Sequence, residues 1–112
     1  MGKAKTLMIL GTEYRIKYVD ENANILDGAD GRCDFWKKEI LVSDCRSWSR
    51  ERMLKYRNTC LRHEIIHAFL YESGLAYNTD PVNHWATNEE MVDWIAIQSP
   101  KIFALFAEAE CL

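Results

Sequence analysis

The first part of the chain alternates apolar and polar residues in the way that a half-buried β-strand does. Within residues 6–20, Tyr14, Ile16 and Tyr18 would face one side, and the charged residues between them would face the other. Gly11 is the position at which this strand would break. We therefore expect extended structure here with one face buried.

A loop and a hairpin are expected next. Residues 21–31 are dense in turn-forming residues and are typical of a loop. Two short β-favouring runs follow, at residues 33–36 and 39–42, and Lys37 and Lys38 join them. The charged turn of this hairpin would also discourage pairing at an exposed sheet edge.

The pattern changes to a helical period after residue 44. No glycine or proline occurs from Ser49 to Ser73. The apolar positions in this stretch are Met53, Leu54, Cys60, Leu61, Ile65, Phe69 and Leu70. This spacing predicts one long amphipathic helix that begins after Ser47 or Ser49 and ends before Gly74.

Two further helices are predicted after a loop at residues 75–86. Thr87 and Glu90 have the spacing of a capping box, so the second helix would begin there. Ser99 and Pro100 would begin a third helix, with serine as the N-cap and proline at the first helical position. Strand-forming segments thus precede helical ones, which is typical of an α+β domain.

We predict a small antiparallel sheet packed on the long helix and the two further helices. The 112 residues suit a single domain, residues 1–112, with one hydrophobic core. A net charge of −3 provides no broad electrostatic reason to bind nucleic acid or an anionic membrane. No apolar run reaches the roughly 18 residues of a membrane span. Four widely spaced cysteines and no signal-peptide pattern lead us to expect reduced thiols in a cytoplasmic protein.

An H-E-x-x-H motif lies within the predicted long helix, at residues 63–67. Residues four apart share one helix face, so the imidazoles of His63 and His67 could hold one zinc ion. Glu64 would lie near the metal but outside the row of ligands. From that position it could accept a proton from a zinc-bound water.

A catalytic zinc site needs a third protein ligand, and His84, Glu89 and Glu90 are the candidates. The capping box would occupy Glu90, because its side chain would reach back to the backbone N–H of Thr87. That leaves Glu89 as the expected ligand and His84 as a bystander. Asp93 lies one turn further along the same face and could accept the second N–H of a zinc-bound histidine.

The two motifs together resemble those of the gluzincin zinc peptidases. In that family, H-E-x-x-H is followed by a helix with N-E-x-x-x-D, which Asn88, Glu89 and Asp93 match. The short gap and the preceding strands look more like the minimal ImmA/IrrE-type metallopeptidases of bacteria, phages and mobile elements. The resemblance covers residues 40–96. No helix-turn-helix or other DNA-binding domain, which sometimes accompanies that type, is visible.

The resemblance implies a zincin-like fold and a role for each motif residue. The implied site has His63, His67 and Glu89 as zinc ligands, Glu64 as general base and Asp93 as the residue that orients a ligand. No firm counterpart of the oxyanion-stabilising residue of larger gluzincins is visible. His84, Tyr71 and Tyr77 are candidates for that role.

Two hypotheses of function follow. In the first, the chain is a zinc-dependent metallopeptidase that acts on a protein or peptide substrate, which an exposed strand at residues 39–42 would align by strand addition. In the second, it is a phage or mobile-element interaction protein that retains the zincin fold and its zinc without efficient proteolysis. The presence of Glu64 favours the first hypothesis, because a structural zinc site has no need of a general base.

Overall fold

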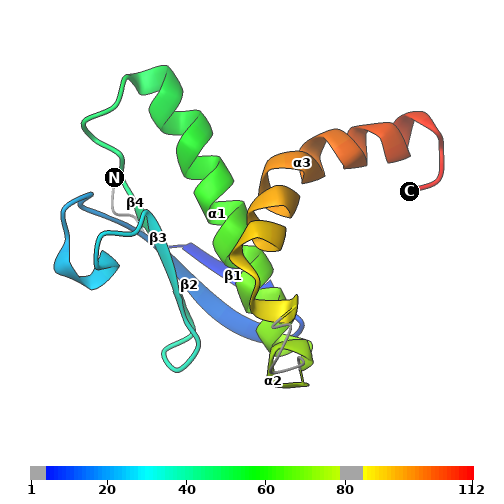
Figure 1. The fold of residues 1–112 in the computed structure, drawn as a ribbon, viewed down its shortest axis with the longest axis horizontal. Coiled ribbons are helices and arrows are strands. Elements are labelled where there is room, and N and C mark those ends of the chain that lie inside the picture. The colour runs from blue at the N-terminus through cyan, green and yellow to red at the C-terminus, as the bar shows by residue number, and fades with distance from the viewer. Residues whose placement is uncertain (1–4, 79–84) are drawn as a thin grey trace.

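A small sheet and two long helices make up the computed structural model, which describes residues 5–78 and 85–112 (Figure 1). The strands are β1 (Lys5–Ile9), β2 (Thr12–Val19), β3 (Gly31–Asp34) and β4 (Glu39–Ser43). The helices are α1 (Arg50–Glu72), α2 (Leu75–Asn78) and α3 (Glu89–Glu108), with 3-10 turns at Asn24–Leu26 and Trp85–Thr87. The α+β class expected from the sequence is therefore present.

The four described strands form one sheet in the order β1-β2-β4-β3. Strands β1 and β2 pair antiparallel across a tight turn at Leu10 and Gly11, so the long predicted strand does break there. The predicted hairpin is also present, as the antiparallel pair β3 and β4. Strand β4, however, runs parallel to β2, so the sheet is mixed and the prediction of an antiparallel sheet is wrong.

The central place of β4 explains the mixed sheet. All five residues of β4 are buried, whereas the four residues of β3 are partly or fully exposed. A strand that is apolar on both faces gains most from a position between two neighbours. The chain therefore leaves β2, forms the outer strand β3 first and returns to place β4 between β2 and β3.

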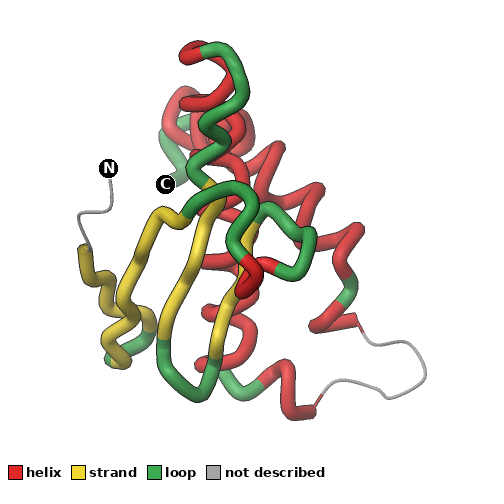
Figure 2. Tube along the Cα trace, turned by 90° about the vertical axis from the view of Figure 1, so that its left-hand side faces the viewer, coloured by secondary structure: helices red, strands yellow, loops and turns green. Residues whose placement is uncertain are grey.

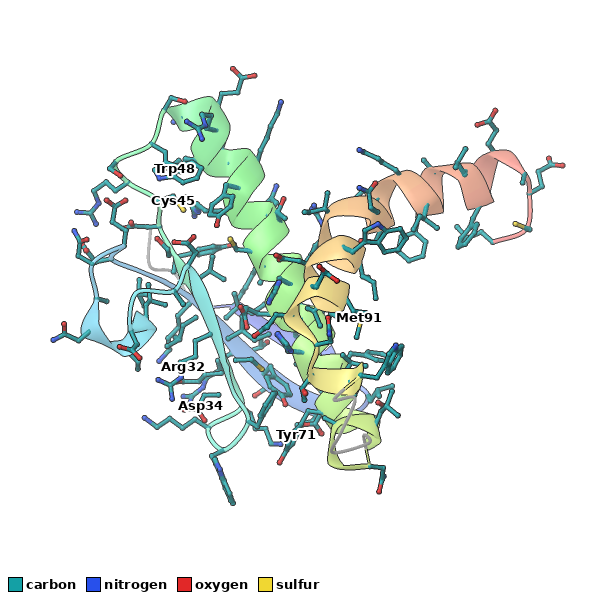
Figure 3. The ribbon with its side chains drawn as sticks, viewed as in Figure 1. Arg32, Asp34, Cys45, Trp48, Tyr71 and Met91 are labelled. Carbon is teal, nitrogen blue, oxygen red and sulfur yellow. The ribbon has the colours of Figure 1, made fainter. Side chains whose placement is uncertain are left out.

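One face of the sheet carries the hydrophobic core, and both long helices lie on that side (Figure 2). Helix α1 contacts β1, β3 and β4, while α3 packs against α1. The buried core residues between the sheet and α1 are Ile9, Tyr14, Ile16, Ile40, Val42 and Ala68. On the opposite face, Arg32 and Asp34 of β3 project away from α1 (Figure 3).

Helix α1 agrees with the predicted bounds, and its predicted apolar face is confirmed in part, because Cys60, Leu61 and Ile65 pack against the core. It follows the N-cap Ser49 and ends before Gly74, which has a positive φ of 86° and so suits glycine. The two buried residues of the helix are Glu64 and Ala68. Leu54 and Phe69, which we expected in the core, are exposed because the helix turns its H-E-x-x-H side towards the sheet and α3.

Helix α3 begins one residue later than the capping-box prediction. Its N-cap is Asn88, whose side chain accepts a hydrogen bond from the backbone N–H of Met91 at 2.8 Å. Thr87 belongs to the preceding 3-10 turn, so the predicted capping box with Glu90 is wrong. Asparagine satisfies the free N–H groups of a first turn better than threonine does, which favours the later start.

The predicted third helix is also wrong, because α3 continues through Pro100 to Glu108. A proline inside a helix leaves the carbonyl four residues earlier without its usual partner. Here that carbonyl belongs to Ala96, and Nε of Arg62 in α1 donates a hydrogen bond to it at 2.6 Å. The guanidinium of Arg62 thus replaces the lost backbone hydrogen bond and allows α3 to continue.

Three smaller expectations are settled for the described residues. The predicted loop at residues 75–86 contains the short helix α2 at its start. Cys33, Cys45, Cys60 and Cys111 are free thiols. None of the described helices combines the length and the apolarity that a membrane crossing requires.

Glu72 joins the end of α1 to the sheet. Its carboxylate accepts hydrogen bonds from the hydroxyl of Thr12 at 3.0 Å, the phenol of Tyr14 at 2.6 Å and the ammonium of Lys38 at 2.8 Å. The bonds from Lys38, Tyr14 and Thr12 lower the pKa of Glu72. Burial and the bond to Glu72 raise the pKa of Tyr14.

We predict that Glu72→Gln lowers the free energy of unfolding at pH 7 by about 1–3 kcal/mol, the range for hydrogen bonds to a charged group. The pKa of Glu72 is lowered in the folded state, so its contribution is complete above the unfolded value of about 4.3 and is lost as the pH falls through the folded value. Urea titrations at several pH values should therefore show the difference disappear in acid. The control Glu13→Gln, on an exposed side chain of β2, should change little; equal stability of Glu72→Gln and wild type at pH 7 would contradict the prediction.

Candidate metal centre

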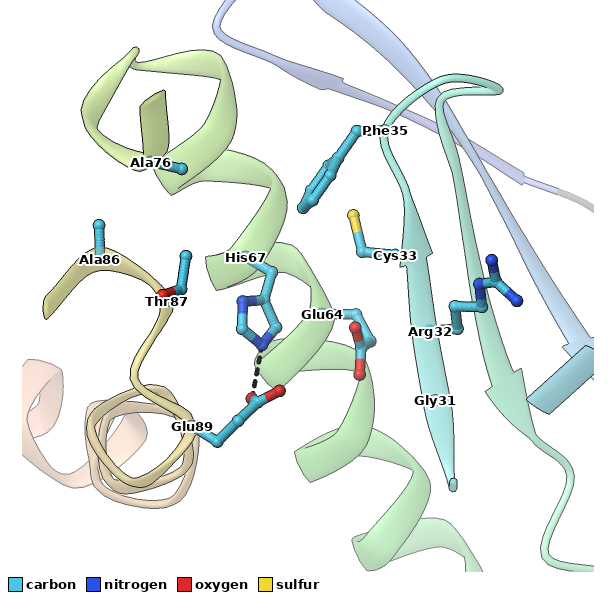
Figure 4. Close-up of a pocket in the computed structure, with 10 residues that line it drawn as sticks. All are labelled: Gly31, Arg32, Cys33, Phe35, Glu64, His67, Ala76, Ala86, Thr87 and Glu89. Atoms are coloured by element: carbon cyan, nitrogen blue, oxygen red, sulfur yellow. Dashed lines mark hydrogen bonds and ion pairs between the residues drawn. The ribbon is translucent and has the colours of Figure 1, made fainter. Parts of the chain in front are cut away.

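The two histidines of the H-E-x-x-H motif lie on the side of α1 that faces α3. Their Nε2 atoms are 3.1 Å apart, and both rings are mostly buried. Oε1 of Glu89, the first residue of α3, lies 3.0 Å from Nε2 of His63 and 2.8 Å from Nε2 of His67. Figure 4 shows the contact between Glu89 and His67. The structure thus brings the three predicted ligand atoms together from two helices.

Asp93 controls how His63 presents its nitrogen atoms. Oδ1 of Asp93 lies 2.8 Å from Nδ1 of His63. With its proton on Nδ1 and donated to this carboxylate, the ring keeps the lone pair of Nε2 directed at Glu89 and His67. The predicted position of Asp93, one helical turn beyond Glu89, is therefore the observed one.

Glu89 takes its position from the start of α3, although the capping argument that selected it is wrong. Because Asn88 is the N-cap, Glu90 is the second helical residue and does not have the predicted capping role. Glu89 and Asp93 are four residues apart and share the face that meets α1. Burial raises the pKa of Glu89, but the hydrogen bond and charge of His67 and the charge of His63 outweigh it, so its pKa lies below the ordinary value.

The three donor atoms fit a zinc ion in kind and in spacing. Two imidazoles and one carboxylate are a common protein ligand set for catalytic zinc. In a tetrahedral zinc site with bonds of about 2.0–2.2 Å, neighbouring ligand atoms lie roughly 3.3–3.5 Å apart. The observed separations of 2.8–3.1 Å define a triangle only slightly smaller than this. The group could therefore hold a metal with small side-chain shifts.

Glu64 is a buried carboxylate that points from α1 towards β3 (Figure 4). Its exposure is only 7%, and it forms no hydrogen bond or ion pair within the part of the chain that the structure describes. Burial raises its pKa to about 7, the carboxylates of Glu89 and Asp93 add to this, and His63 opposes it. A carboxyl group with such a pKa can both accept and release a proton near neutral pH.

The surroundings of Glu64 differ from those of Glu39, the other buried glutamate among the described residues. Glu39 in β4 is 8% exposed, close to the 7% of Glu64. Its Oε2, however, lies 3.1 Å from the guanidinium of Arg15 and 3.0 Å from the ammonium of Lys17. Buried charges in proteins are normally paired in this way. Glu64 lacks such a partner among the described residues, which is typical of a group reserved for chemistry.

Gly31 at the start of β3 makes room for Glu64. A Cβ atom at this position would lie 2.8 Å from Oε2 and 3.1 Å from Cγ of Glu64. Any side chain would therefore displace the carboxylate or the strand. The sequence analysis missed this role, because Gly31 lies at the end of a turn-rich segment and nothing local reveals a contact with a residue 33 positions later.

Two open hollows, each of about 350 Å³, meet at Glu64 between β3 and the helices. Gly31, Glu64 and Glu89 border both. One also contains Cys33, Phe35, His67 and Ala86, and the other contains Asp30, Tyr56, His63 and Ile97. Together they form a cleft that passes the three donor atoms and runs beside the edge of the sheet.

The strand beside this cleft is β3, not the segment at residues 39–42. That predicted exposed strand is β4, which is buried between β2 and β3 and cannot accept a further strand. The edge position of β3 leaves backbone groups on its outer side unpaired by the sheet. The correction follows from the mixed order of the sheet.

Among the candidates for an oxyanion-stabilising role, Tyr71 is the one whose side chain the structure describes. Tyr71 stacks on Phe35 with a centroid distance of 4.1 Å, and the ammonium of Lys38 lies 4.9 Å from its ring. His84 lies outside the described residues, as does the side chain of Tyr77. The expectation that His84 is a bystander therefore remains a prediction.

Comparison with known proteins adds no functional information. The chain matches no protein-family model, no curated protein and no solved structure. A fold on its own does not define a function. The function of this chain has to be inferred from the donor atoms, the buried carboxylate and the cleft.

Proposed function

We propose that this protein is a zinc-dependent metallopeptidase with a minimal zincin-like fold. The observation that carries the proposal is the meeting of Nε2 of His63, Nε2 of His67 and Oε1 of Glu89 at 2.8–3.1 Å. The buried carboxylate of Glu64 beside them has no partner among the described residues, which favours a catalytic over a structural site. The resemblance to gluzincins seen in the two sequence motifs supports the same conclusion.

Three side chains would hold the zinc ion, and a fourth would orient them. His63 and His67 would bind through Nε2 and Glu89 through its carboxylate, with Asp93 holding the ring of His63. Zinc supplies Lewis acidity, which lowers the pKa of a water molecule and polarises a peptide carbonyl.

Glu64 would move the proton in hydrolysis. Its carboxylate takes a proton from the attacking water and later delivers it to the leaving amine. Burial raises the pKa of this carboxyl group, which strengthens it as a proton acceptor. Gly31 keeps the carboxylate in place between β3 and the metal ligands.

An extended peptide would bind along the outer edge of β3. The cleft runs beside this edge, and unpaired backbone groups there can align a substrate chain by strand addition. The peptide bond to be cleaved would then cross the cleft next to Glu64. This replaces the alignment on residues 39–42 that we expected from the sequence.

We predict that removing any one ligand weakens zinc binding in a graded order. His63→Ala, His67→Ala and Glu89→Ala should each lose stoichiometric zinc, because only two ligand side chains remain. Asp93→Ala should weaken zinc binding about 10- to 100-fold through the loss of ligand orientation. Elemental analysis of the purified variants, followed by zinc titration, measures this.

The control for the ligand set is Glu90→Ala. This residue is also a glutamate and is adjacent to Glu89 in sequence, but its carboxylate is not part of the donor group. Its loss should leave zinc binding unchanged. If Glu90→Ala removes the metal and Glu89→Ala does not, the assigned ligand set is wrong.

We predict that Glu64→Gln keeps zinc and stability but lowers hydrolysis by on the order of 100-fold or more, because an amide cannot take up the proton. Mass spectrometry of a proteome-derived peptide library measures cleavage without knowledge of the substrate. Glu90→Gln is the matched control and should cleave like wild type. A zinc-loaded wild type that cleaves nothing in the library would contradict the peptidase proposal and favour the interaction protein.

We predict that Gly31→Ala lowers the cleavage rate by about 10- to 100-fold while zinc content stays the same, because the added methyl group displaces the Glu64 carboxylate. The same library assay, with zinc analysis, tests this. Lys37→Ala, in the exposed turn after β3 and outside both hollows, should cleave normally. Full activity of Gly31→Ala would show that the close approach of β3 does not position Glu64.

A further inference from the structure

The two hollows that meet at Glu64 follow one another along the cleft. One, which we name the Asp30 hollow, lies at the start of β3 and beside residues 56–64 of α1. The other, the Phe35 hollow, lies beside the rest of β3 and residues 64–67 of α1 (Figure 4). A peptide extended along β3 would pass from one hollow to the other. The residues on the two sides of its cleaved bond would therefore have different surroundings.

The Asp30 hollow is negatively charged. The carboxylates of Glu64 and Glu89 border both hollows, and those of Asp30 and Asp93 border this one alone. No lysine or arginine of the described residues lines it. The two charges of a zinc ion would offset the first pair of carboxylates and leave the second. Because Asp93 is engaged with Nδ1 of His63, Asp30 is the carboxylate that the proposed metal site does not use.

Asp30 is held in place without a cationic partner. Its Oδ2 accepts a hydrogen bond from the hydroxyl of Tyr56 at 2.5 Å, and the ring of Tyr56 stacks on Trp48 with centroids 4.5 Å apart. Among the described residues, no lysine, arginine or histidine forms an ion pair with Asp30. The next residue, Gly31, is where β3 approaches Glu64. Asp30 thus presents an available negative charge close to the reacting groups.

Glu64 indicates independently that this space is suited to a ligand. It is 7% exposed, borders the Asp30 hollow and has no hydrogen-bond or ion-pair partner among the described residues. Buried polar groups are normally satisfied, so its oxygens have bonding capacity that a bound molecule can use. The volume of about 350 Å³ lies at the lower end of the range for ligand pockets, which suits one long side chain.

The Phe35 hollow has a different character. The apolar side chains that line it are those of Cys33, Phe35, Ala76 and Ala86. Arg32 also borders it, but the guanidinium of Arg32 donates a hydrogen bond to the carbonyl of Ile25 at 3.2 Å, outside the hollow. This part of the cleft therefore favours an apolar side chain.

The pairing on β3 sets the direction of the peptide. Strand β3 runs from Gly31, beside the Asp30 hollow, to Asp34, beside the Phe35 hollow. Antiparallel strands pair somewhat more stably than parallel ones. A peptide antiparallel to β3 runs from the Phe35 hollow to the Asp30 hollow. The residue before the cleaved bond would then lie in the Phe35 hollow and the residue after it in the Asp30 hollow.

We propose that Asp30 selects a lysine or arginine directly after the cleaved bond, so that the substrates are peptides in which an apolar residue precedes a basic one. This inference rests on the proposed peptidase function. The ammonium or guanidinium of the substrate pairs with the carboxylate of Asp30 in a charge-assisted hydrogen bond. Its aliphatic stem lies along Cys60 and Ile97, which line the same hollow.

Mapping of cleavage sites in a peptide library tests the preference. The library is prepared from a proteome with a glutamate-specific protease, because trypsin would remove internal lysine and arginine. Zinc-loaded wild type should show basic residues directly after the cleaved bond on the order of tenfold more often than acidic ones, the scale expected for a hydrogen bond to a charged group. Apolar residues should be enriched directly before the bond.

Two synthetic peptides measure the effect of Asp30 directly. They copy a well-cleaved site and differ only in having lysine or norleucine after the bond. Asp30→Asn removes the charge but keeps an acceptor for Tyr56, and it should lower the lysine-to-norleucine ratio of kcat/KM on the order of tenfold. The matched control is Asp27→Asn, in the same turn-rich segment but outside both hollows, and its ratio should equal that of wild type.

Binding without turnover provides a second readout. Fluorescence anisotropy of the labelled peptides on zinc-loaded Glu64→Gln should show that lysine binds more tightly than norleucine. The double variant Glu64→Gln with Asp30→Asn should lose this difference. Circular dichroism and zinc analysis establish that each variant is folded and loaded, and Asp30→Ser replaces Asp30→Asn if the latter is unfolded.

Cleavage without enrichment of basic residues after the bond would overturn the inference and leave the peptidase proposal standing. The same holds for equal lysine-to-norleucine ratios in wild type and Asp30→Asn, and for basic residues enriched before the bond instead of after it. A zinc-loaded wild type that cleaves nothing would contradict the peptidase proposal itself, and the inference would fall with it.

Discussion

The packing of α1 on the sheet sets the position of every group at the candidate site. Ala68 is completely buried and lets the helix approach the strands closely, while Glu72 ties the helix end to β2 and to Lys38. A helix turns by about 100° per residue, so the packing of α1 on the sheet determines the directions of several of its side chains at once. Glu64 is directed at β3, and His63 and His67 are directed at α3. A change in the rotation of α1 would move all three side chains together.

The candidate site contains a buried carboxylate in an arrangement that is unfavourable for stability. An ionised carboxylate away from water is costly unless it is paired, and Glu39 shows how this chain pairs one. Glu64 is buried to the same degree without a partner among the described residues, and its raised pKa is the consequence. Gly31 contributes the space in which this unfavourable arrangement persists. Local departures from stability are expected where a protein keeps a group ready for a reaction.

The two ends of helix α3 have different surroundings. Its first turns face α1 and carry Glu89 and Asp93, while its last turns face solvent with a largely apolar surface. The bond from Arg62 to the carbonyl of Ala96 lies between them and compensates for Pro100. Because this bond is made by a residue adjacent to His63, the helix is held on α1 close to the donor atoms.

Local chemistry in the sequence was enough to predict most of the elements and the candidate ligands. The absence of glycine and proline predicted α1, and spacings of four residues placed His63 with His67 and Glu89 with Asp93 on shared faces. These predictions succeed because helix geometry depends only on nearby residues. The choice between Thr87 and Asn88 as N-cap was wrong, since both are suitable and their difference is small.

Only the tertiary structure decided how these elements meet. The central place of β4 depends on which strand gains most from burial on both faces, a comparison between segments that no local pattern contains. The same holds for the approach of Gly31 to Glu64 and for the bond that carries α3 past Pro100. The sequence by itself determined the long helix α1 and the spacing of the candidate metal-binding residues. Tertiary packing determined the relative positions of these elements, because contacts between residues distant in sequence depend on the free energy of the whole folded chain.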